Sequence, residues 1–427
     1  MTARLGVAAA FELSWKDLPQ SAKELLYLLS LFALEPIALN WLELSHPNKV
    51  ASRLLKAELR EKLIRLNLVK ENRDGTYQLH QLIREFSQQK LDLIEYQQGI
   101  AKALTDIAQK LPERPIHEDI EALAPAIPHI EEIVEELKNS LSNKDLSKPF
   151  QGLSQWYFHK GNFPKAIFWT ERCLPITKER VGNSHADVAS SLNYLGYYHH
   201  SQGSFQKAES LYKESLEINI EIFGDEHSNV ISGKNDLSIL YQDQGKFIEA
   251  EKLQLEVIDL TKKNIGEDTL DYSDALNNLA CSYEMKGRYS EAEPLHIKAI
   301  EIKKKILGEE DSYTIDGINN LAFLYHEQGQ LEKAEPLYRK IVELDTKLLG
   351  EEHLQTIAHV ENLGALYRDK GRYEKAAPLL LKALDVRRKK LGEEHLAVFK
   401  SLNHVGALYL YQKRYDEAQK LLEKAIK

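Results

Sequence analysis

Asparagine side chains recur along the C-terminal two thirds of the chain at a spacing that suits molecular recognition. They stand at multiples of 42 residues, and a second set lies one position later: Asn193, Asn235, Asn277, Asn319 and Asn403, then Asn278, Asn320 and Asn362. A carboxamide has two N–H donors and an acceptor, so a row of them can pair with an extended peptide backbone without reading its sequence. The same amides could instead join neighbouring helices and hold them in register, and the sequence leaves both roles open.

Residues that would support catalysis or metal binding are not arranged to do so. The sequence has no Gly-x-x-x-x-Gly-Lys-[Ser/Thr] loop to cradle a triphosphate, and no Ser/His/Asp arrangement stands out. Cys173 and Cys281 lack partners at metal-ligand spacing. Four histidines repeat between units, but neighbouring units pack about 8–10 Å apart, whereas zinc ligands lie about 2.0–2.1 Å from the metal. They are His185, His227, His353 and His395. We predict a protein that is not an enzyme, with no cofactor and no metal.

The overall charge argues against two further classes of partner. The 427 residues include 56 Lys plus Arg and 65 Asp plus Glu, which gives a formal net charge of −9. Nucleic acid or an anionic membrane would instead attract a basic surface. No apolar run approaches the roughly 20 residues that span a bilayer, the N-terminus is a poor signal peptide, and cysteine is scarce. We therefore expect a cytoplasmic protein without a membrane partner.

Glycine and alanine mark a repeat of 42 residues. One glycine series includes Gly245 and Gly287, an alanine follows each member by five residues, and a second glycine series includes Gly266 and Gly308. In each repeat an apolar stripe at i, i+3, i+4 and i+7 predicts a helix that ends at the first glycine, and a second helix ends at the second. The alanine allows the two helices to cross closely. Because one pair cannot bury its own apolar face, the pairs must stack into a solenoid.

The repeat resembles the tetratricopeptide repeat, in the 42-residue form of the kinesin light chain. The resemblance rests on Leu276-Asn-Asn-Leu-Ala280, Gly287-Arg-Tyr-Ser-Glu-Ala-Glu-Pro294 and Gly308-Glu-Glu, and it covers about residues 145–427 in seven units. It implies an all-α fold, a right-handed α-solenoid whose first helices line a concave peptide groove. The asparagines would then lie in this groove, where Tyr197 and Arg368 could add specificity.

The N-terminal 95 residues have a different pattern. Residues 11–90 predict helices, then a hairpin from Leu68 to Leu79 with an Asp-Gly turn, then a further helix, which is the order of a winged helix. The middle helix is basic, which suggests DNA contact, but Glu58 and Glu61 interrupt its charged surface. Its basic residues are Arg53, Lys56, Arg60, Lys62 and Arg65.

This segment resembles the winged-helix module of NB-ARC-type signal-transduction NTPases. The motifs are Phe11-Glu-Leu-Ser-Trp15, the run from Leu25 to Ala33, and Tyr77-Gln-Leu-His-Gln-Leu-Ile-Arg-Glu-Phe86. In that family the module follows the nucleotide-binding domain and precedes a repeat sensor. His80 matches the histidine that reaches the β-phosphate of ADP, although Leu79 and Gln81 replace the usual Met and Asp. Without a nucleotide-binding domain, His80 would act only with a separate NB-ARC-type partner chain.

These patterns predict three segments and one leading function. The segments are a winged-helix domain over 1–95, a Pro-containing helical connector over 96–145, and the repeat solenoid over 146–427. We predict a non-catalytic scaffold that binds a peptide or protein partner, as the sensor part of a split or truncated NB-ARC-type NTPase. The alternatives are a kinesin-light-chain-like cargo or assembly adaptor and a winged-helix transcription regulator.

Overall fold

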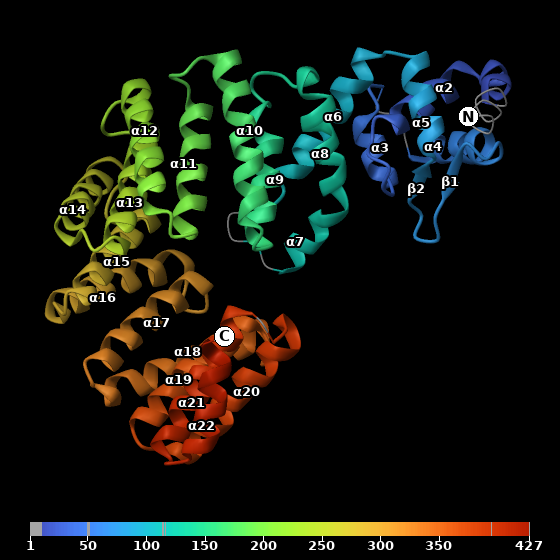
Figure 1. The fold of residues 1–427 in the computed structure, drawn as a ribbon. Coiled ribbons are helices and arrows are strands. Elements are labelled where there is room, and N and C mark those ends of the chain that lie inside the picture. Colours follow the sequence, from blue (N-terminus) through green and yellow to red (C-terminus); the bar gives the residue numbers. More distant parts are fainter. Residues whose placement is uncertain (1–10, 49–51, 113–114, 116, 394, 427) are drawn as a thin grey trace. The chain divides into compact units, whose positions relative to one another are not determined.

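The computed structural model describes residues 11–48, 52–112, 115, 117–393 and 395–426, and the described chain is mostly helical (Figure 1). The chain divides into two compact units, residues 1–233 and residues 234–427. The predicted all-α fold with one small hairpin is confirmed.

The first unit opens with short helices and the predicted hairpin. Its elements are α2 (Gln20–Ser30), α3 (Leu39–Ser45), α4 (Ser52–Glu58), a π-helical turn η1 (Leu59–Ile64), β1 (Val69–Glu71), β2 (Tyr77–Leu79) and α5 (Gln81–Lys90). The strands pair antiparallel, Val69 opposite Leu79. Gly75 takes φ of 80° in the turn, a left-handed conformation that glycine adopts without steric cost.

The segment that the sequence predicted as a connector is packed into the same hydrophobic core as the helices before it. It contains α6 (Ile94–Ala108), α7 (His117–Leu123), η2 (Ala124–Ala126), α8 (Ile127–Glu136) and η3 (Lys138–Ser140). On α8, the fully buried ring of His129 accepts a hydrogen bond from the Ala33 N–H at 3.1 Å and lies 3.2 Å from the Pro36 carbonyl oxygen. Burial lowers the pKa of His129 to about 4, so the ring is neutral at pH 7. Arg84 also pairs with Glu132 of α8.

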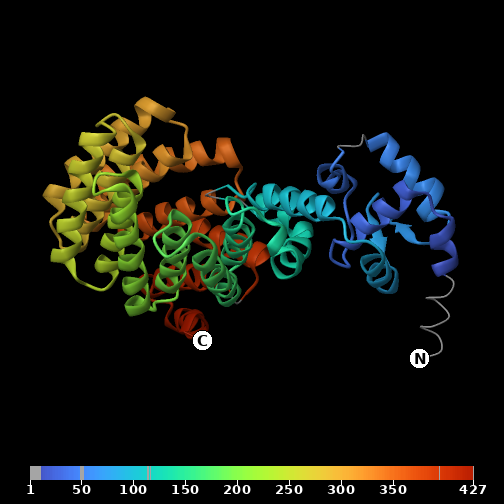
Figure 2. The same ribbon diagram turned by 90° about the horizontal axis from the view of Figure 1, so that it is seen from above.

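Antiparallel helix pairs occupy the rest of the described chain, and Figures 1 and 2 show them stacked one after another within each unit. The first unit holds α9 (Ser147–His159), α10 (Phe163–Val181), α11 (Ala186–Ser201) and α12 (Phe205–Phe223). Next come α13 (Ser228–Asp243), α14 (Phe247–Asn264), α15 (Leu270–Met285), α16 (Tyr289–Leu307), α17 (Ser312–Glu327), α18 (Leu331–Leu349), α19 (Leu354–Asp369), α20 (Tyr373–Leu391), α21 (Leu396–Tyr411) and α22 (Tyr415–Ile426). Gly287 and Gly308 follow their helices at φ of 69° and 90°, as the sequence predicted.

The repeated alanine lies where the two helices of a repeat cross. Every member of the series is fully buried: Ala166, Ala208, Ala250, Ala292, Ala334, Ala376 and Ala418. A small residue on the first helix lies against the residue four positions after this alanine. In α19 it is Gly364, where an added Cβ would stand 2.8 Å from the Leu380 Cδ2 atom of α20. Small side chains on both helices therefore set the distance between them.

Candidate functional site

The asparagine rows form a ladder of hydrogen bonds between first helices of successive repeats in the second unit. The amide Nδ2 of the second asparagine donates to Oδ1 of the first asparagine one repeat earlier. The pairs are Asn278 to Asn235 at 2.9 Å, Asn320 to Asn277 at 3.0 Å, and Asn362 to Asn319 at 3.1 Å. All six side chains are half-buried. The ladder matches the register role that the sequence left open, and contact with a peptide stays a prediction for these residues.

At the repeat that begins with α19, charged hydrogen bonds replace the amide pairs of the ladder. Glu361 replaces the first asparagine there, and its carboxylate accepts hydrogen bonds from Arg387 at 2.7 Å and from the Ser401 hydroxyl at 2.6 Å. Arg387 Nη1 also donates to Ser401 Oγ at 2.7 Å. All three residues are buried, so an ionic cluster joins α19, α20 and α21 where amides join the earlier repeats.

The other residues predicted for the groove lie in different surroundings. Asn193 is half-buried beside a small polar cavity of about 170 Å³ that Asn219 and Asn229 also line. Tyr197 is 45% exposed, with its ring centroid 4.9 Å from that of Phe158. Asn403 is exposed.

Arg368 belongs to a polar cluster across three first helices. Its guanidinium donates to Asp369 at 2.7 Å and lies 3.4 Å from the His404 ring of α21. Asp369 also lies 2.9 Å from His326 Nε2 of α17. Burial opposes ionisation of Asp369, but the hydrogen bonds and charges of Arg368 and His326 together outweigh it and lower the pKa of that carboxyl. Within this cluster the Arg368 side chain of α19 is half-buried.

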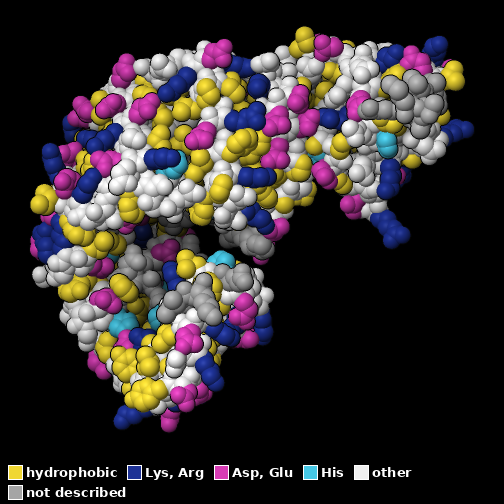
Figure 3. Space-filling view, in the orientation of Figure 1, with side chains coloured by type: hydrophobic (Ala, Val, Ile, Leu, Met, Phe, Trp, Pro, Cys, Tyr) yellow, Lys and Arg dark blue, Asp and Glu magenta, His cyan; other side chains and the backbone are white. Residues whose placement is uncertain are grey.

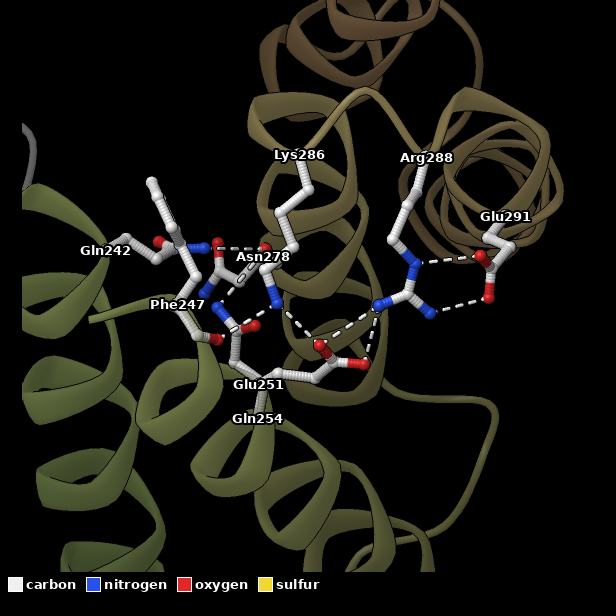
Figure 4. A network of polar contacts seen from close by, with 8 residues as sticks. All are labelled: Gln242, Phe247, Glu251, Gln254, Asn278, Lys286, Arg288 and Glu291. Carbon is white, nitrogen blue, oxygen red and sulfur yellow. Dashed lines mark hydrogen bonds and ion pairs between the residues drawn. The ribbon is translucent and has the colours of Figure 1, made fainter. Parts of the chain in front are cut away.

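Ion pairs between second helices and the following repeat fix the stacking further (Figure 4). Lys286 Nζ, after α15, donates to the Glu251 carboxylate of α14 at 2.5 Å and to the Phe247 carbonyl at 3.0 Å. Arg288 Nη1 donates to the same carboxylate at 2.9 Å and its other nitrogens reach Glu291. Two amides, Gln242 and Gln254, converge on the Asn278 carbonyl oxygen at 3.4 and 3.3 Å. Glu335 repeats this arrangement with Lys370 and Arg372.

The acidic residues after the second glycine series make another set of inter-repeat bonds. Each accepts from a lysine of the next second helix: Lys298 to Glu267 at 2.9 Å, Lys340 to Glu309 at 2.6 Å, and Lys382 to Glu351 at 2.8 Å. Hydrogen bonds from Lys262 and Lys298 lower the pKa of Glu267 to about 2. The Gly308-Glu-Glu element thus connects one repeat to the next.

We expect Glu335→Gln to remove part of the pH dependence of stability. The hydrogen bond from Lys370 lowers the pKa of Glu335, whereas an unfolded glutamate titrates near pH 4.3. The ionised pair therefore stabilises the fold fully above about pH 4.3, and the contribution is lost as pH falls through the lowered folded value. At pH 7 the variant should lose about 1–2 kcal/mol in urea unfolding, and the difference from wild type should vanish in acid.

Glu332→Gln is the matched control for this prediction, since Glu332 pairs with the same Lys370 but its side chain is 84% exposed. It should change stability by less than about 0.5 kcal/mol. Equal losses in the two variants, or a Glu335→Gln loss that persists unchanged at pH 3, would contradict the assignment.

The repeated histidines cap helices. In His185, His227, His353 and His395 the Nδ1 atom accepts from the backbone N–H two residues later, at 3.1 to 3.3 Å. This bond satisfies one of the N–H groups that a helix start leaves without a partner. His80 does the same for α5, where its exposed ring accepts from the Leu82 N–H at 3.2 Å. An open cavity of about 460 Å³ lies beside it. The nucleotide-sensing role suggested for His80 stays a prediction.

Sequence reasoning missed one group of donors. His296 of α16 is fully buried, and its ring lies between Asn277 and Glu284 of α15, with Cys281 close by. The sequence contained one indication of this group: positions 281, 284 and 296 all hold residues that differ from those at the corresponding positions of the neighbouring repeats. The sequence analysis found no metal-ligand partner for Cys281 because it considered spacing along the chain, whereas His296 lies on the partner helix.

The family assignment follows from the repeat geometry and from comparison with known proteins. The tetratricopeptide repeat family profile matches residues 145–221, 229–305, 313–377 and 356–427, well over half of the chain. The chain belongs to the tetratricopeptide repeat family. None of the curated proteins matches it.

Solved structures of tetratricopeptide proteins resemble the chain at low identity. The apo quorum sensor NprR of B. thuringiensis is 16% identical, with a TM-score of 0.55 over 81% of this chain and 91% of that one. Putative kinesin-light-chain repeats of Podosopora anserina are 24% identical, with a TM-score of 0.43 over 48% and 98%. A signal transduction ATPase with numerous domains and a tetratricopeptide repeat sensor, from Pyrococcus horikoshii, is 17% identical, with a TM-score of 0.48 over 97% and 64%. The likeness to NprR shows the tetratricopeptide fold alone.

Across the part of the chain that the structure describes, no helix has both the length and the apolar character that a bilayer crossing demands.

On the face in Figure 3, basic and acidic side chains are interspersed and form no large patch of one sign. On the basic middle helix of the N-terminal segment, Arg60 is paired with Glu71 at 3.0 Å. These observations do not favour a nucleic-acid surface.

Proposed function

We propose that this tetratricopeptide protein is a non-catalytic scaffold whose first-helix surface binds an extended peptide or a protein partner. The observation that carries the proposal is a row of exposed and half-buried side chains on the first helices of the second unit, which the amide ladder holds at a fixed spacing. Phe323 follows Asn319 by four residues and therefore lies on the same face of α17, where it is 48% exposed. In the first unit, taken by itself, Tyr197 holds the corresponding position in α11 and is also exposed.

The asparagines would contribute to such a surface through the N–H donors and oxygen lone pairs that the ladder bonds do not use. Each carboxamide has two N–H donors and an oxygen with two lone pairs. A ladder bond uses one N–H of the second amide and one lone pair of the first. A backbone carbonyl of the partner could accept from Asn235 or Asn319, while exposed aromatic rings such as Phe323 would supply apolar contact. Arg368, whose charge is balanced by Asp369, would add guanidinium N–H donors to this surface.

A more specific proposal concerns the N-terminal segment. We propose that residues 1–95 form a winged-helix module and that residues 96–145 connect it to the repeats at 146–427. The order of helices and hairpin supports this assignment, and the sequence motifs around Phe11 and Tyr77 suggest a module of the NB-ARC type. In this proposal the repeats are the sensor of a signalling NTPase, and His80 contacts nucleotide only when a separate nucleotide-binding chain docks.

Site-directed photo-cross-linking tests the binding surface. The photoreactive analogue p-benzoylphenylalanine replaces Phe323 on the first-helix face, or Ile297 on the second helix α16 as the matched control. Both side chains are exposed, at 48% and 38%. We expect a discrete cross-linked product in cells of the source organism from position 323 and none from position 297.

A further inference from the structure

Three side chains with metal-binding chemistry meet between α15 and α16. They are Cys281 and Glu284, three residues apart on α15, and His296 on α16. The ligand atoms of these three residues all lie within 4.8 Å of one another, and no other group of three among the described residues meets that condition. The His296 side chain is fully buried, and Glu284 is 14% exposed.

The orientation of His296 follows from the amide ladder. Asn320 Nδ2 donates to Asn277 Oδ1 at 3.0 Å, in the same sense as the other two ladder pairs, so the Asn277 oxygen is an acceptor. His296 Nδ1 lies 3.1 Å from that oxygen and must carry its hydrogen there. The lone pair of the neutral ring is then on Nε2. A histidine that ligates a metal has this arrangement, with its other ring nitrogen donating to a fixed oxygen.

The Nε2 atom faces an acceptor as well. It lies 2.8 Å from Glu284 Oε1, so a lone pair of the ring and a lone pair of the carboxylate point at each other. Only a cation between them, a proton or a metal ion, makes this contact favourable. Cys281 supplies a third donor from the next turn of α15, and Asn277 Nδ2 lies 3.9 Å from its sulfur.

We propose that Cys281, Glu284 and His296 bind a transition-metal ion of the Zn²⁺ type. One sulfur, one nitrogen and one oxygen donor leave a fourth position of a tetrahedral ion open to a water or a partner's side chain. Ligand atoms around such an ion lie roughly 3.3–3.8 Å apart, so the side chains need to move by only about 1 Å. The sulfur and imidazole donors favour Zn²⁺ over Mg²⁺ or Ca²⁺, which prefer oxygen ligands.

This constellation is confined to one repeat. The next repeat has Phe323, His326 and Tyr338 at the corresponding positions, and the preceding repeat has Ile239, Gln242 and Gln254. A cysteine ligates a metal ion as the thiolate, so metal binding would release the thiol proton of Cys281.

Metal titration of the full-length protein tests the proposal. The protein, first stripped with a chelator and dialysed, is titrated with Zn²⁺ in a calorimeter and with Co²⁺ in a spectrophotometer. We expect one ion per chain, with the intense d–d absorption of tetrahedral Co²⁺ and a thiolate-to-cobalt charge-transfer band. Absence of stoichiometric uptake by wild type, or a Co²⁺ spectrum without the thiolate band, would overturn the proposal and leave a proton shared between His296 and Glu284.

Variants assign the ligands. Cys281→Ser should abolish the charge-transfer band and weaken Zn²⁺ binding by at least tenfold, and Asn277→Ala, which removes the support of His296, should weaken it about 10–100-fold. Cys173→Ser is the matched control, because Cys173 is the other cysteine, is buried, and lies in the first unit. It should bind like wild type. A charge-transfer band that survives in Cys281→Ser but is lost in Cys173→Ser would refute the assignment of Cys281 as the thiolate ligand. If a variant fails to fold, the wild-type Co²⁺ spectrum still decides whether the protein binds a metal through a thiolate.

Discussion

Replacing Arg387 with alanine is expected to lower the free energy of unfolding of the second unit by about 3–5 kcal/mol. The guanidinium is 8% exposed and pairs with Glu361, whose side chain is 6% exposed. Removing the arginine leaves the Glu361 carboxylate buried without the arginine's countercharge, although the Ser401 hydroxyl still donates to it. A buried charge without a countercharge is costly, whereas replacement of both partners by apolar residues of similar size is often tolerated. Arg387→Met with Glu361→Met should therefore recover much of the loss.

Urea unfolding followed by circular dichroism measures this effect. Arg388→Ala is the matched control, because the neighbouring Arg388 pairs with the exposed Glu393, and it should cost about 0.5 kcal/mol. All four tryptophans precede residue 170, so their fluorescence reports on the first unit separately. A loss of less than about 1 kcal/mol in Arg387→Ala would show that the pair is solvated and would contradict its placement in the core.

Enlarging the alanine at a helix crossing is expected to have the second largest effect. Ala376 is fully buried where α20 crosses α19, and the cores of tetratricopeptide repeats are packed to the density of other protein interiors. Ala376→Leu adds three carbons at this crossing, which should force the helices apart and cost about 1–3 kcal/mol.

Ala377 offers the control, since it is the next residue of the same helix and is only half-buried. Ala377→Leu changes composition and helix propensity in the same way and should change the urea midpoint little. If the two leucine variants unfold at the same urea concentration, the alanine series does not set the helix spacing.

Much of the fold could be predicted because the glycines and alanines that end the helices and allow them to cross recur at a constant spacing in the sequence. The 42-residue spacing of Gly287, Gly308 and Ala292 places helix ends and crossings, and each of these depends on the local backbone or on one small side chain. The turn at Gly75 was predictable for the same reason. Helix ends near 285, 307 and 327 agree with the sequence pattern because a glycine in left-handed conformation follows each of them, or follows within two residues.

The site was harder to predict because it depends on partners far apart in the sequence. The ladder from Asn320 to Asn277 joins residues 43 apart, and their spacing alone is compatible with both a peptide contact and a bond between helices. Glu361 stands where earlier repeats have an asparagine, but the sequence does not indicate that Arg387 pairs with its carboxylate. His296 could be placed against Cys281 only after the crossing of α15 and α16 was known.

The most direct measurement of the central claim is the comparison of photo-cross-linking from the two helix layers. If the first-helix surface binds the partner, the analogue at position 323 gives a product of defined mass, excess unlabelled wild-type protein suppresses it, and the analogue at position 297 gives none. A product from position 297 alone, or products of equal yield from both positions, would show that the first-helix surface is not where the partner binds.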